Sequence, residues 1–549
     1  MPKKGASRKG LRSASRDRPV LVHHLLEASA DRTPERPAVW YQDQWTTFAE
    51  VDGRSNKLAN SLKDNGISRG DRVALLYENS LDYIIAYFAI LKAGAITVAL
   101  NTDTTATSLV ALLNHSGARA IITNPRFARF INPALAEAPG VELAILDRDD
   151  SREEKGIGRP RRISLETIYV SGKAARPDVQ TIDLDIASIV YTSGSTGRPK
   201  GVTLSHLNIV SNTRSIVEYL KLTASDRVMV VLPFPYIYGK SLLNTHFFAG
   251  GSVVIDNRFA YPQKVLETMQ KTEVTGFAGV PSTYLILLNK SAVRKFRFPC
   301  LRYVTQAGGA LAPAVQKKVA RVFAPARLYV MYGATEAAAR LSYLEPDMLP
   351  KKWGSIGKPI PNVDLFVADE AGRRLPPGQA GELVARSSSI MVGYWKDPEA
   401  TAQALRNGLY RTGDLGCEDE EGYLYITGRA NDMIKPGGFR VSAKEVEEAI
   451  YELEGVHEAA VLGVEDSVLG EAVKAFIVPK KEIGGLGLDV EQVRKALSRA
   501  LPPYKLPKYI EFRKALPRNE SSKVLKAALR EGKTISDPSA PGETENDEG

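Results

Sequence analysis

The chain has 549 residues, of which 44% are hydrophobic and 25% are charged, so it can bury several cores and is unlike a disordered or collagen-like chain. Its formal net charge is +10 at pH 7, but seven of its basic residues crowd into residues 1–18, which favours a solvated tail over a nucleic-acid-binding face. The two cysteines, Cys300 and Cys417, are too few for a disulfide framework or a zinc site, which favours a reducing, cytoplasmic compartment.

The basic tail leaves two other interpretations open. Its Arg and Ser content is compatible with a transit peptide, although an amphipathic apolar face is missing. DNA binding would rest on the charge of this tail alone. No apolar run reaches the roughly 18 to 20 residues of a membrane span, and no secretory signal is visible.

After the tail, helical and strand patterns alternate, which predicts an α/β fold. Thr47 and Glu50 form a capping-box pattern ahead of a helix. The apolar run 73–77 predicts a buried strand, and Asn79 is expected to cap the following helix. Similar strands are expected at 95–100, 120–123, 187–190, 228–232, 252–255, 275–280, 301–305 and 328–331.

The stretch 150–178 is charged and is expected to be an irregular surface excursion. From about residue 429 the pattern changes to a smaller α+β unit, with helices predicted at 443–453 and 490–500 and strands near 459–464 and 472–478. We therefore predict disordered tails at 1–19 and 533–549, an N-terminal domain at 20–428, a short connection at 429–431 and a C-terminal domain at 432–532.

The strongest chemical signal is the segment 191–201, with the sequence YTSGSTGRPKG, which follows the predicted strand 187–190. Backbone N–H groups of its glycines, several hydroxyl groups and the cation of Lys200 are the groups that a polyphosphate needs. The alternative, a flexible Gly/Ser connector, does not account for so many phosphate-binding groups in a row. This loop is therefore predicted to bind phosphate.

Two other loop types are excluded by spacing. A Walker A loop needs Gly-Lys followed by Ser or Thr, whereas Lys200 follows Pro199. The Gly239-Lys240-Ser241 run has Phe234 where the first glycine of that motif should stand. A nucleophile elbow needs glycine two residues before its serine, a position that Ser193 occupies, so hydrolase chemistry loses support.

The loop resembles the signature of the adenylate-forming superfamily, which includes acyl-CoA synthetases, peptide-synthetase adenylation domains and beetle luciferases. Further motifs agree in order and spacing over roughly residues 20 to 530: YGATE at 332–336, YRTGD at 410–414, GR at 428–429, IKPGGFRV at 434–441 and Lys523. The resemblance implies a large N-terminal domain of layered α/β subdomains with a small barrel-like part, and a mobile α+β C-terminal domain.

The resemblance also assigns the nucleotide site. Glu336 is implied to hold Mg²⁺ on the ATP phosphates and Thr335 to help place the α-phosphate, while Asp414 accepts hydrogen bonds from the ribose hydroxyls with Arg429 beside it. The ATP- or AMP-binding set then comprises Thr192, Ser193, Gly194, Ser195, Thr196, Gly197, Lys200, Gly309, Ala310, Tyr332, Gly333, Asp414 and Arg429.

Lys523 is assigned to the first chemical step, where a cation stabilises the charge that develops as the carboxylate attacks phosphorus. The family usually has glycine before this lysine, and this chain has Ser522. The family's hinge falls on Asn431, where many relatives carry Asp or Lys. Gly438 and Arg440 are implied to border the coenzyme A path, and Lys435 to reach the site only for thioester formation.

The acyl site is less well defined. Tyr236 stands where many relatives have histidine, and the set is completed by Gly239, Gly308 and Arg340. Arg340 and the nearby Lys240 raise the hypothesis of a substrate with a distal polar or anionic group. The simpler alternative is that both side chains reach solvent or pair with structural acids.

The predicted activity is an ATP-dependent carboxylic acid:coenzyme A ligase that forms an acyl-adenylate and then a thioester, using ATP, Mg²⁺ and coenzyme A. Three alternatives remain: a ligase that loads the pantetheine of a separate carrier protein, a luciferase-like oxygenase, and a nucleotide-binding regulator without catalysis. Retention of Lys200, Glu336, Asp414 and Lys523 argues against the last, because a pure binder would not need Lys523. The partner is a small carboxylic acid.

Overall fold

The computed structural model describes residues 19–147, 160–192, 199–429, 433–436, 441–480, 488–518 and 524–530. The chain divides into two compact units, each treated by itself below. The large unit comprises Met1–Leu311, Val315–Thr412 and Gly416–Tyr425, and the small unit comprises Ala312–Ala314, Gly413–Leu415 and Ile426–Gly549.

The first sheet of the large unit has eight strands, which are parallel from β8 to β7 and antiparallel at the β19 end. In spatial order they are β19 (Gly393–Tyr394), β9 (Lys200–Ser205), β8 (Ile186–Thr192), β4 (Ile96–Ala99), β3 (Arg72–Leu76), β5 (Ala118–Thr123), β6 (Leu143–Leu146) and β7 (Arg161–Ser164).

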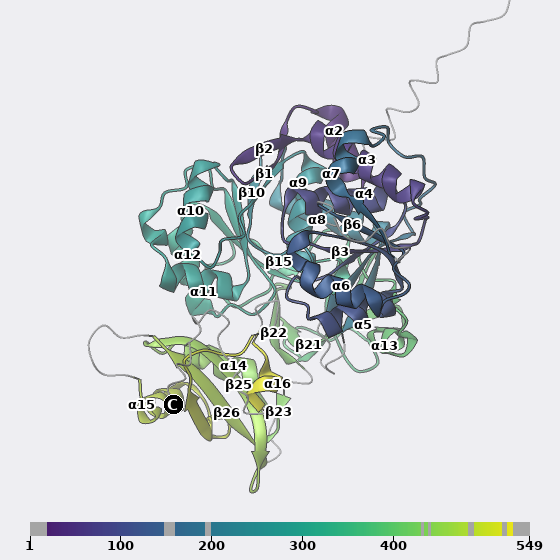
Figure 1. The fold of residues 1–549 in the computed structure, drawn as a ribbon. Helices are drawn as coiled ribbons and strands as arrows, with labels where there is room; N and C mark the ends of the chain where they lie inside the picture. Colours follow the sequence, from purple (N-terminus) through teal and green to yellow (C-terminus); the bar gives the residue numbers. More distant parts are fainter. Residues whose placement is uncertain are drawn as a thin grey trace, which may run out of the picture. The chain divides into compact units, whose positions relative to one another are not determined.

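Helices cover both faces of this sheet (Figure 1). Because side chains alternate along a strand, Val73 and Leu75 of β3 join the core beneath α3 (Phe48–Asp64) and α4 (Leu81–Lys92), whereas Ala74 and Leu76 face α5 (Ala106–Ser116) and α6 (Ala128–Ala136). The short η1 (Pro125–Phe127) precedes α6. A strand buried on both faces explains why 73–77 reads as a continuous apolar run.

The second sheet of the large unit has nine strands and is parallel between β1 and β14. Its order is β16 (Lys358–Pro359), β15 (Ser342–Leu344), β14 (Arg327–Tyr332), β13 (Tyr303–Gln306), β12 (Gly276–Gly279), β10 (Arg227–Val230), β11 (Ser252–Ile255), β1 (Pro37–Tyr41) and β2 (Gln44–Thr47).

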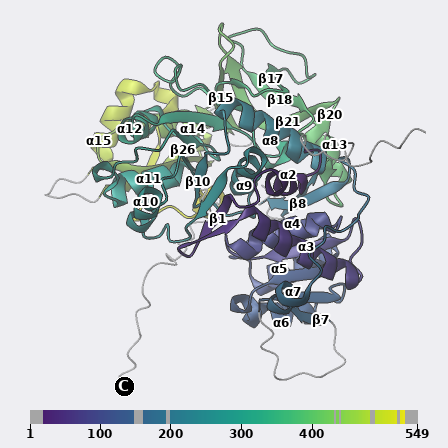
Figure 2. The same ribbon diagram turned by 90° about the horizontal axis from the view of Figure 1, so that it is seen from above.

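Two groups of helices pack on this second sheet (Figure 2). α2 (His24–Arg32), α8 (His206–Leu220) and α9 (Ile237–Ala249) share one core with α4 of the first sheet. Phe88 of α4 stacks on Phe247 of α9 with the ring centroids 5.4 Å apart. The other group is α10 (Pro262–Lys271), α11 (Pro281–Lys290), η2 (Val293–Lys295) and α12 (Pro313–Phe323).

A third, five-stranded sheet contains β17 (Val363–Ala368), β18 (Gly381–Ser387), β20 (Leu405–Arg406), β21 (Leu409–Glu418) and β22 (Leu424–Arg429), with α13 (Pro398–Ala404) before β20. In the small unit, β25 (Val456–Asp466), β26 (Gly470–Pro479) and β27 (Tyr509–Phe512) form a sheet, and β23 (Met433–Ile434) pairs with β24 (Val441–Ser442). Its helices are α14 (Ala443–Tyr451), α15 (Val490–Ala500), η6 (Pro503–Lys505) and α16 (Lys526–Arg530).

Two of the expected local structures are confirmed and two are wrong. The capping box of Thr47 and Glu50 is present, and α15 begins and ends where predicted. The cap of α4 is Ser80, because Asn79 instead bonds the backbone of Leu232 and of residue 234. The stretch 160–178 is not irregular throughout, since β7 adds to the sheet edge and is followed by α7 (Leu165–Ser171).

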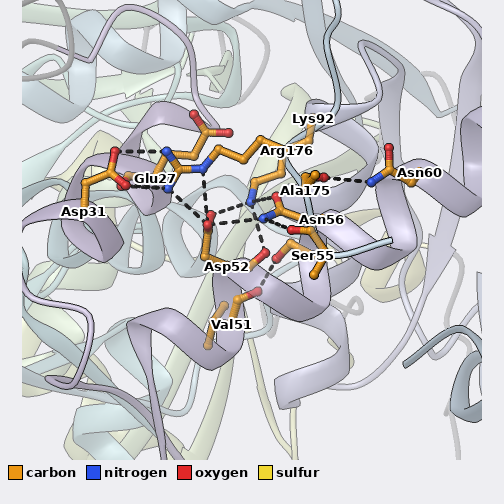
Figure 3. A network of polar contacts seen from close by, with 11 residues as sticks. Glu27, Asp31, Val51, Asp52, Ser55, Asn56, Asn60, Lys92, Ala175 and Arg176 are labelled. Atoms are coloured by element: carbon orange, nitrogen blue, oxygen red, sulfur yellow. Dashed lines mark hydrogen bonds and ion pairs between the residues drawn. The ribbon is translucent and has the colours of Figure 1, made fainter. Parts of the chain in front are cut away.

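A buried ionic network joins four segments of the large unit (Figure 3). Lys92 of α4 donates to Asp52 at 2.5 Å and to Asn56 at 2.7 Å, both on α3. Arg176 pairs with Asp52 at 3.1 Å and with Asp31 of α2 at 2.8 Å. Burial lowers the pKa of Lys92 while Asp52 opposes the shift. Each buried charge here has a partner, as the cost of desolvation demands.

Membrane-spanning segments and the two cysteines were considered in the sequence, and the structure bears on both. No helix among the described residues is long and apolar enough to cross a membrane. Both cysteines are free thiols, with Cys300 exposed and Cys417 half-buried.

Candidate active site

The predicted phosphate loop connects two neighbouring strands of the first sheet. β8 ends at Thr192 and β9 begins at Lys200, and these two residues are register partners in the antiparallel pair. The Thr192 hydroxyl donates to the Lys200 carbonyl at 3.5 Å. Ser193, Gly194, Ser195, Thr196 and Gly197 lie outside the described residues. The described anchors bring both ends of the loop together at one edge of the sheet.

A cation, a phenol and a carboxylate meet beside this loop. The Lys200 Nζ lies 5.1 Å from the centroid of the Tyr394 ring, and the Tyr394 hydroxyl donates to Glu336 Oε1 at 2.9 Å. Burial and the neighbouring Glu336 raise the pKa of Tyr394, so its hydroxyl keeps its proton. Lys200 begins β9 of the first sheet, Glu336 lies on the turn after β14 of the second sheet, and the side chain of Tyr394 on β19 contacts both.

Glu336 reaches this position through a tight return of the chain after β14. Thr335 and Glu336 lie on the short η3 (Thr335–Ala337), and the amide of Met391 donates to the Glu336 carbonyl at 2.7 Å. A Cβ on Gly333 would lie 1.9 Å from the Ala339 carbonyl oxygen, so only glycine fits where the chain returns. Tyr332, the last residue of β14, is half-buried next to this turn.

The turn Gly308–Gly309–Ala310 follows β13 and is exposed. Gly308 has a φ of +83°, a left-handed conformation that favours glycine. The Gln306 side chain donates to the Gly309 carbonyl at 2.7 Å and so braces the turn. The structure places this turn and the Tyr332–Glu336 segment at the carboxyl ends of adjacent parallel strands, where open α/β sheets bind ligands.

Tyr236 and Gly239 lie at the start of α9. The Tyr236 hydroxyl accepts a hydrogen bond from Asn101 at 3.0 Å. A Cβ on Gly239 would lie 2.3 Å from the Pro233 carbonyl oxygen, so this glycine allows the helix to begin against the loop that precedes it. Its requirement is therefore explained by the backbone alone.

Arg340 and Lys240 do not reach solvent, which contradicts the simpler of the two sequence interpretations. Lys240 is 0% exposed and Arg340 is 3% exposed. Among the described residues neither cation has an acid within the 4.0 Å of an ion pair. The Lys240 Nζ has no hydrogen-bond partner in the described part of the chain and lies 5.0 Å from the Tyr87 ring centroid, and burial lowers its pKa to about 7.

The predicted ribose-binding pair forms in the small unit. The Arg429 Nε donates to Asp414 Oδ1 at 2.8 Å, and Asp414 is 6% exposed. The backbone amide of Lys435 donates to the Glu471 carboxylate at 2.6 Å, while the Lys435 side chain is exposed. Asn431, Gly438, Arg440 and Lys523 lie outside the described residues, so their predicted roles stay predictions.

A family model described as AMP-binding enzyme matches residues 26–395, and a second, its C-terminal domain, matches residues 445–523. The chain belongs to this family. It is 32% identical to the long-chain-fatty-acid–CoA ligase of Bacillus subtilis (strain 168) over 535 residues, covering 93% of this chain and 94% of that protein. It is 33% identical to the feruloyl-CoA synthase of an Amycolatopsis species over 504 residues, covering 91% and 96%.

Solved structures of adenylate-forming enzymes have the same fold as this AMP-binding enzyme. The anthranilate CoA ligase AuaEII in complex with anthranoyl-AMP superposes with a TM-score of 0.86 at 26% identity, covering 94% of this chain and 98% of that one. ATP-bound MatB from Rhodopseudomonas palustris superposes with a TM-score of 0.83 at 30% identity, covering 93% and 99%. The fold class predicted from the sequence is thus confirmed.

Sequence reasoning missed two residues of this family member. Tyr394 contacts both Lys200 and Glu336, but it lies 58 positions after Glu336, and its pairing through β19 with β9 leaves no local pattern. Asn212 of α8 holds the backbone of Arg340 by two hydrogen bonds of 3.1 and 2.8 Å. A polar residue within a stretch of helical apolar spacing was the available signal for Asn212, and it was not used in the sequence analysis.

Proposed function

We propose that this chain activates a small carboxylic acid with ATP and transfers the acyl group to coenzyme A. It is an AMP-forming acid–thiol ligase of the acyl-CoA synthetase type. The observation that carries the proposal is the meeting of Lys200, Tyr394 and Glu336 beside the anchored phosphate loop, in a chain that matches both domains of the family.

In the first step, a carboxylate oxygen of the acid forms a bond to the α-phosphorus of ATP, and the bond from that phosphorus to the bridging oxygen of pyrophosphate breaks. Lys200 and the hydroxyl and amide groups of 192–197 are the groups that we assign to the phosphates. Thr335 is assigned to the α-phosphate. Lys523 is assigned to the charge that builds up between the two reactants, since a fixed cation there lowers the barrier.

The donor set of Glu336 fits Mg²⁺. One carboxylate oxygen accepts the Tyr394 hydroxyl, and the other remains as a hard oxygen ligand. When bound, the ion would neutralise charge on the phosphates. The part of this chain is to hold the Glu336 carboxylate still, through the Tyr394 hydroxyl and the backbone bond from Met391.

The nucleoside is assigned to the small turn and the carboxylate pair. Gly309, Ala310, Tyr332 and Gly333 present backbone to the adenine and the acyl-adenylate. Asp414 has two acceptor oxygens in one rigid group, which suits two ribose hydroxyls, and the bond from Arg429 fixes its orientation.

In the second step, the coenzyme A thiol gives up its proton to solvent and its sulfur forms a bond to the acyl carbon, the bond from that carbon to the phosphate oxygen breaks, and AMP leaves. We assign 429–431 as the hinge about which residues 432–532 rotate between the steps, with Gly438, Arg440 and Lys435 serving the thioester-forming state. The acyl-binding residues are Tyr236, Gly239, Gly308 and Arg340. A carrier-protein pantetheine in place of coenzyme A is the alternative acceptor, and a cytoplasmic location is the compartment that we propose.

Pyrophosphate release tests the proposal over a panel of aliphatic, aromatic, hydroxy and dicarboxylic acids, with and without coenzyme A. We expect acid-dependent release that rises with coenzyme A and produces a thioester, identified by its mass. Release without a thioester would indicate a carrier protein as acceptor. Absence of release with every acid would contradict the ligase assignment.

A further inference from the structure

The Arg340 guanidinium is a buried charge without a counter-ion in the described part of the chain. Its Nη1 donates to the Ala339 carbonyl at 3.1 Å, and its Nε contacts the Met331 sulfur at 3.4 Å. Its central carbon lies 4.0 Å from the centroid of the Tyr238 ring. A carbonyl, a thioether and an aromatic face are neutral acceptors, and together they replace only part of the solvation that a guanidinium loses on burial.

The backbone holds Arg340 inward by strain and by a clamp. Ala338 and Ala339 have φ values of +53° and +130°, which residues other than glycine rarely adopt. Asn212, itself 1% exposed, accepts from the Arg340 amide at 3.1 Å and donates to its carbonyl at 2.8 Å. Strained backbone of this kind persists where surrounding contacts enforce it, and it gathers at ligand sites.

The guanidinium faces a small internal cavity of about 10 Å³, roughly the space of one water molecule or one carboxylate oxygen. The cavity is lined by Tyr219 on α8, Leu242 on α9, Thr305 on β13 and Met331 on β14, together with Arg340. Thr305 is three residues before Gly308, and Met331 is one residue before Tyr332. The cavity is therefore bordered by the two strands whose carboxyl ends carry the proposed adenylate site, and by α9.

The groups that face the guanidinium from the surrounding elements are neutral. Burial raises the pKa of Tyr219 and of Tyr238, so both phenols keep their protons. Burial lowers the pKa of His246 to about 4; its Nδ1 donates to the Leu242 carbonyl at 2.8 Å and its Nε2 accepts from Tyr303 at 3.0 Å, so the ring is neutral. Arg340 is thus the only charged side chain among the described residues that line the cavity.

We infer that the Arg340 guanidinium marks the distal end of the acyl site and binds a second carboxylate on the substrate, one oxygen of which takes the space of this cavity, so that the enzyme activates dicarboxylic acids. The inference rests on the proposed ligase function and names its substrate class. One carboxylate reacts with ATP at the strand ends, and the other forms a two-pronged ion pair with the guanidinium fork.

Binding of an anionic substrate group explains why arginine is buried at position 340 better than a purely space-filling role does. A residue that only fills space at the wall of the cavity needs no charge, and Leu or Met would do this without burying one. A buried cation without an acid is unfavourable unless a ligand supplies the anion. A carboxylate pairs with the charge, whereas a hydroxyl or carbonyl would add one more neutral acceptor to those already present. A plain fatty acyl chain would bring methyl groups against the guanidinium.

The test compares acids of equal length that differ only at the far end: adipate, its monomethyl ester and hexanoate, with the corresponding series from succinate and suberate. The readout is kcat/KM for AMP formation with coenzyme A present. Wild-type enzyme is expected to prefer the diacid over its monoester by about 100-fold, the range that a buried carboxylate–guanidinium pair commands. This ratio is measured on the unaltered protein and does not depend on whether a variant folds.

Three variants locate the effect. Arg340→Met is expected to lower the diacid-to-monoester ratio by about 100-fold and Arg340→Lys by about 10-fold, because lysine keeps the charge but loses the fork. Arg373→Met, which removes an arginine that is 82% exposed at its side chain, should leave the ratio unchanged. A wild-type preference for the monoester or the monoacid would overturn the inference while leaving the ligase function intact, as would an unchanged ratio in Arg340→Met. No AMP with any acid would overturn both.

Discussion

Two buried cations lie at helix α9, Lys240 on the helix itself and Arg340 against its Tyr238, and their surroundings differ in one decisive respect. Arg340 faces a cavity and several neutral acceptors. Lys240 is buried against the Tyr87 ring of α4, with no hydrogen-bond partner for its Nζ among the described residues. Both positions break the rule that a buried charge is paired.

The two cations escape the penalty in different ways. Lys240 can lose its proton, because burial has brought its pKa to about 7. Arginine keeps its proton at any physiological pH, so Arg340 must be given a partner instead. A buried lysine without a cavity therefore predicts pH-dependent stability, whereas a buried arginine beside a cavity predicts a ligand.

The largest expected effect is the loss of adenylation rate in Lys523→Ala, which distinguishes a catalytic residue from one that selects the acid. Lys523→Ala is expected to lower kcat for adenylation by about 1,000-fold with every acid, because it removes charge stabilisation in the transition state. Pyrophosphate release for the diacid, the monoester and the monoacid measures it. Lys514→Ala, an exposed lysine of the same unit, serves as the control and should retain wild-type rates. A loss confined to diacids would assign Lys523 to acid selection instead.

Lys240→Met tests the second half of the comparison through stability. The pKa of Lys240 is about 7 in the folded chain and 10.5 without the protein environment, so between these values the unfolded chain binds more protons and stability rises with pH. The stability advantage of Lys240→Met over wild type should therefore shrink by about 2 kcal/mol from pH 7 to pH 9, measured by urea unfolding.

Lys92→Met is the matched control for that experiment. Lys92 is also buried, but it pairs with Asp52 at 2.5 Å. Its replacement removes one of the two cations that pair with the buried Asp52 and leaves only Arg176 at 3.1 Å, so this variant should be less stable than wild type by about 2 kcal/mol, the range of a hydrogen bond to a charged group. Lys240→Met, by contrast, should be more stable than wild type at pH 7. If it were less stable there, as Lys92→Met is expected to be, Lys240 would have a stabilising partner after all.

Asn212→Ala should weaken acid selection without removing the arginine. Loss of the two bonds to the Arg340 backbone lets the guanidinium shift, and the diacid-to-monoester ratio should fall by about 10-fold, close to the cost of one or two buried hydrogen bonds. Asn208→Ala on the same helix also loses two side-chain bonds, to the Ser205 amide and the Ser388 carbonyl, but it does not contact Arg340. Equal ratios in the two variants would contradict the clamp.

The smallest expected effect is on the nucleotide side. Tyr394→Phe removes the 2.9 Å hydrogen bond to Glu336 and should raise KM for MgATP about 5-fold, equally for all acids, in line with one hydrogen bond to a charged group. Tyr169→Phe is the control. It removes a hydrogen bond of the same 2.9 Å length, from Tyr169 to Asp82, between two residues outside the proposed nucleotide site, and it should leave KM for MgATP unchanged. An acid-dependent change in Tyr394→Phe would place Tyr394 at the acyl site.

The sequence predicted the parts of the site that depend on order along the chain. The Gly- and hydroxyl-rich loop could be located because it is a local pattern with a chemical reason, and the family resemblance supplied the Tyr332–Glu336 turn and the Asp414–Arg429 pair. The strands were found to within a few residues because parallel strands buried on both faces are continuous apolar runs. The wrong cap at Asn79 shows the limit, since its side chain bonds Leu232, a contact 153 residues away.

Burial was the property that the sequence could not supply. Lys240 and Arg340 carry side chains that usually reach solvent, and that prior is sound for most lysines and arginines. Whether they do so here depends on α4, α8 and β14, which enclose them from distant parts of the chain. Tyr394 is a similar case, because the two-residue strand β19 pairs with β9 from almost 200 residues away, and such a contact leaves no repeating pattern in the sequence.

The tight return at Gly333 has a consequence for redesign. The chain leaves β14, carries Thr335 and Glu336 and comes back so closely that Ala339 excludes any side chain at position 333. The carboxylate that we assign to Mg²⁺ and the arginine that we assign to acid selection therefore lie on one short turn of the chain. A variant library aimed at new acids should vary position 340 and the facing residues of α8 and α9 while keeping 333–339 constant, because changes within this turn would alter selectivity and turnover together.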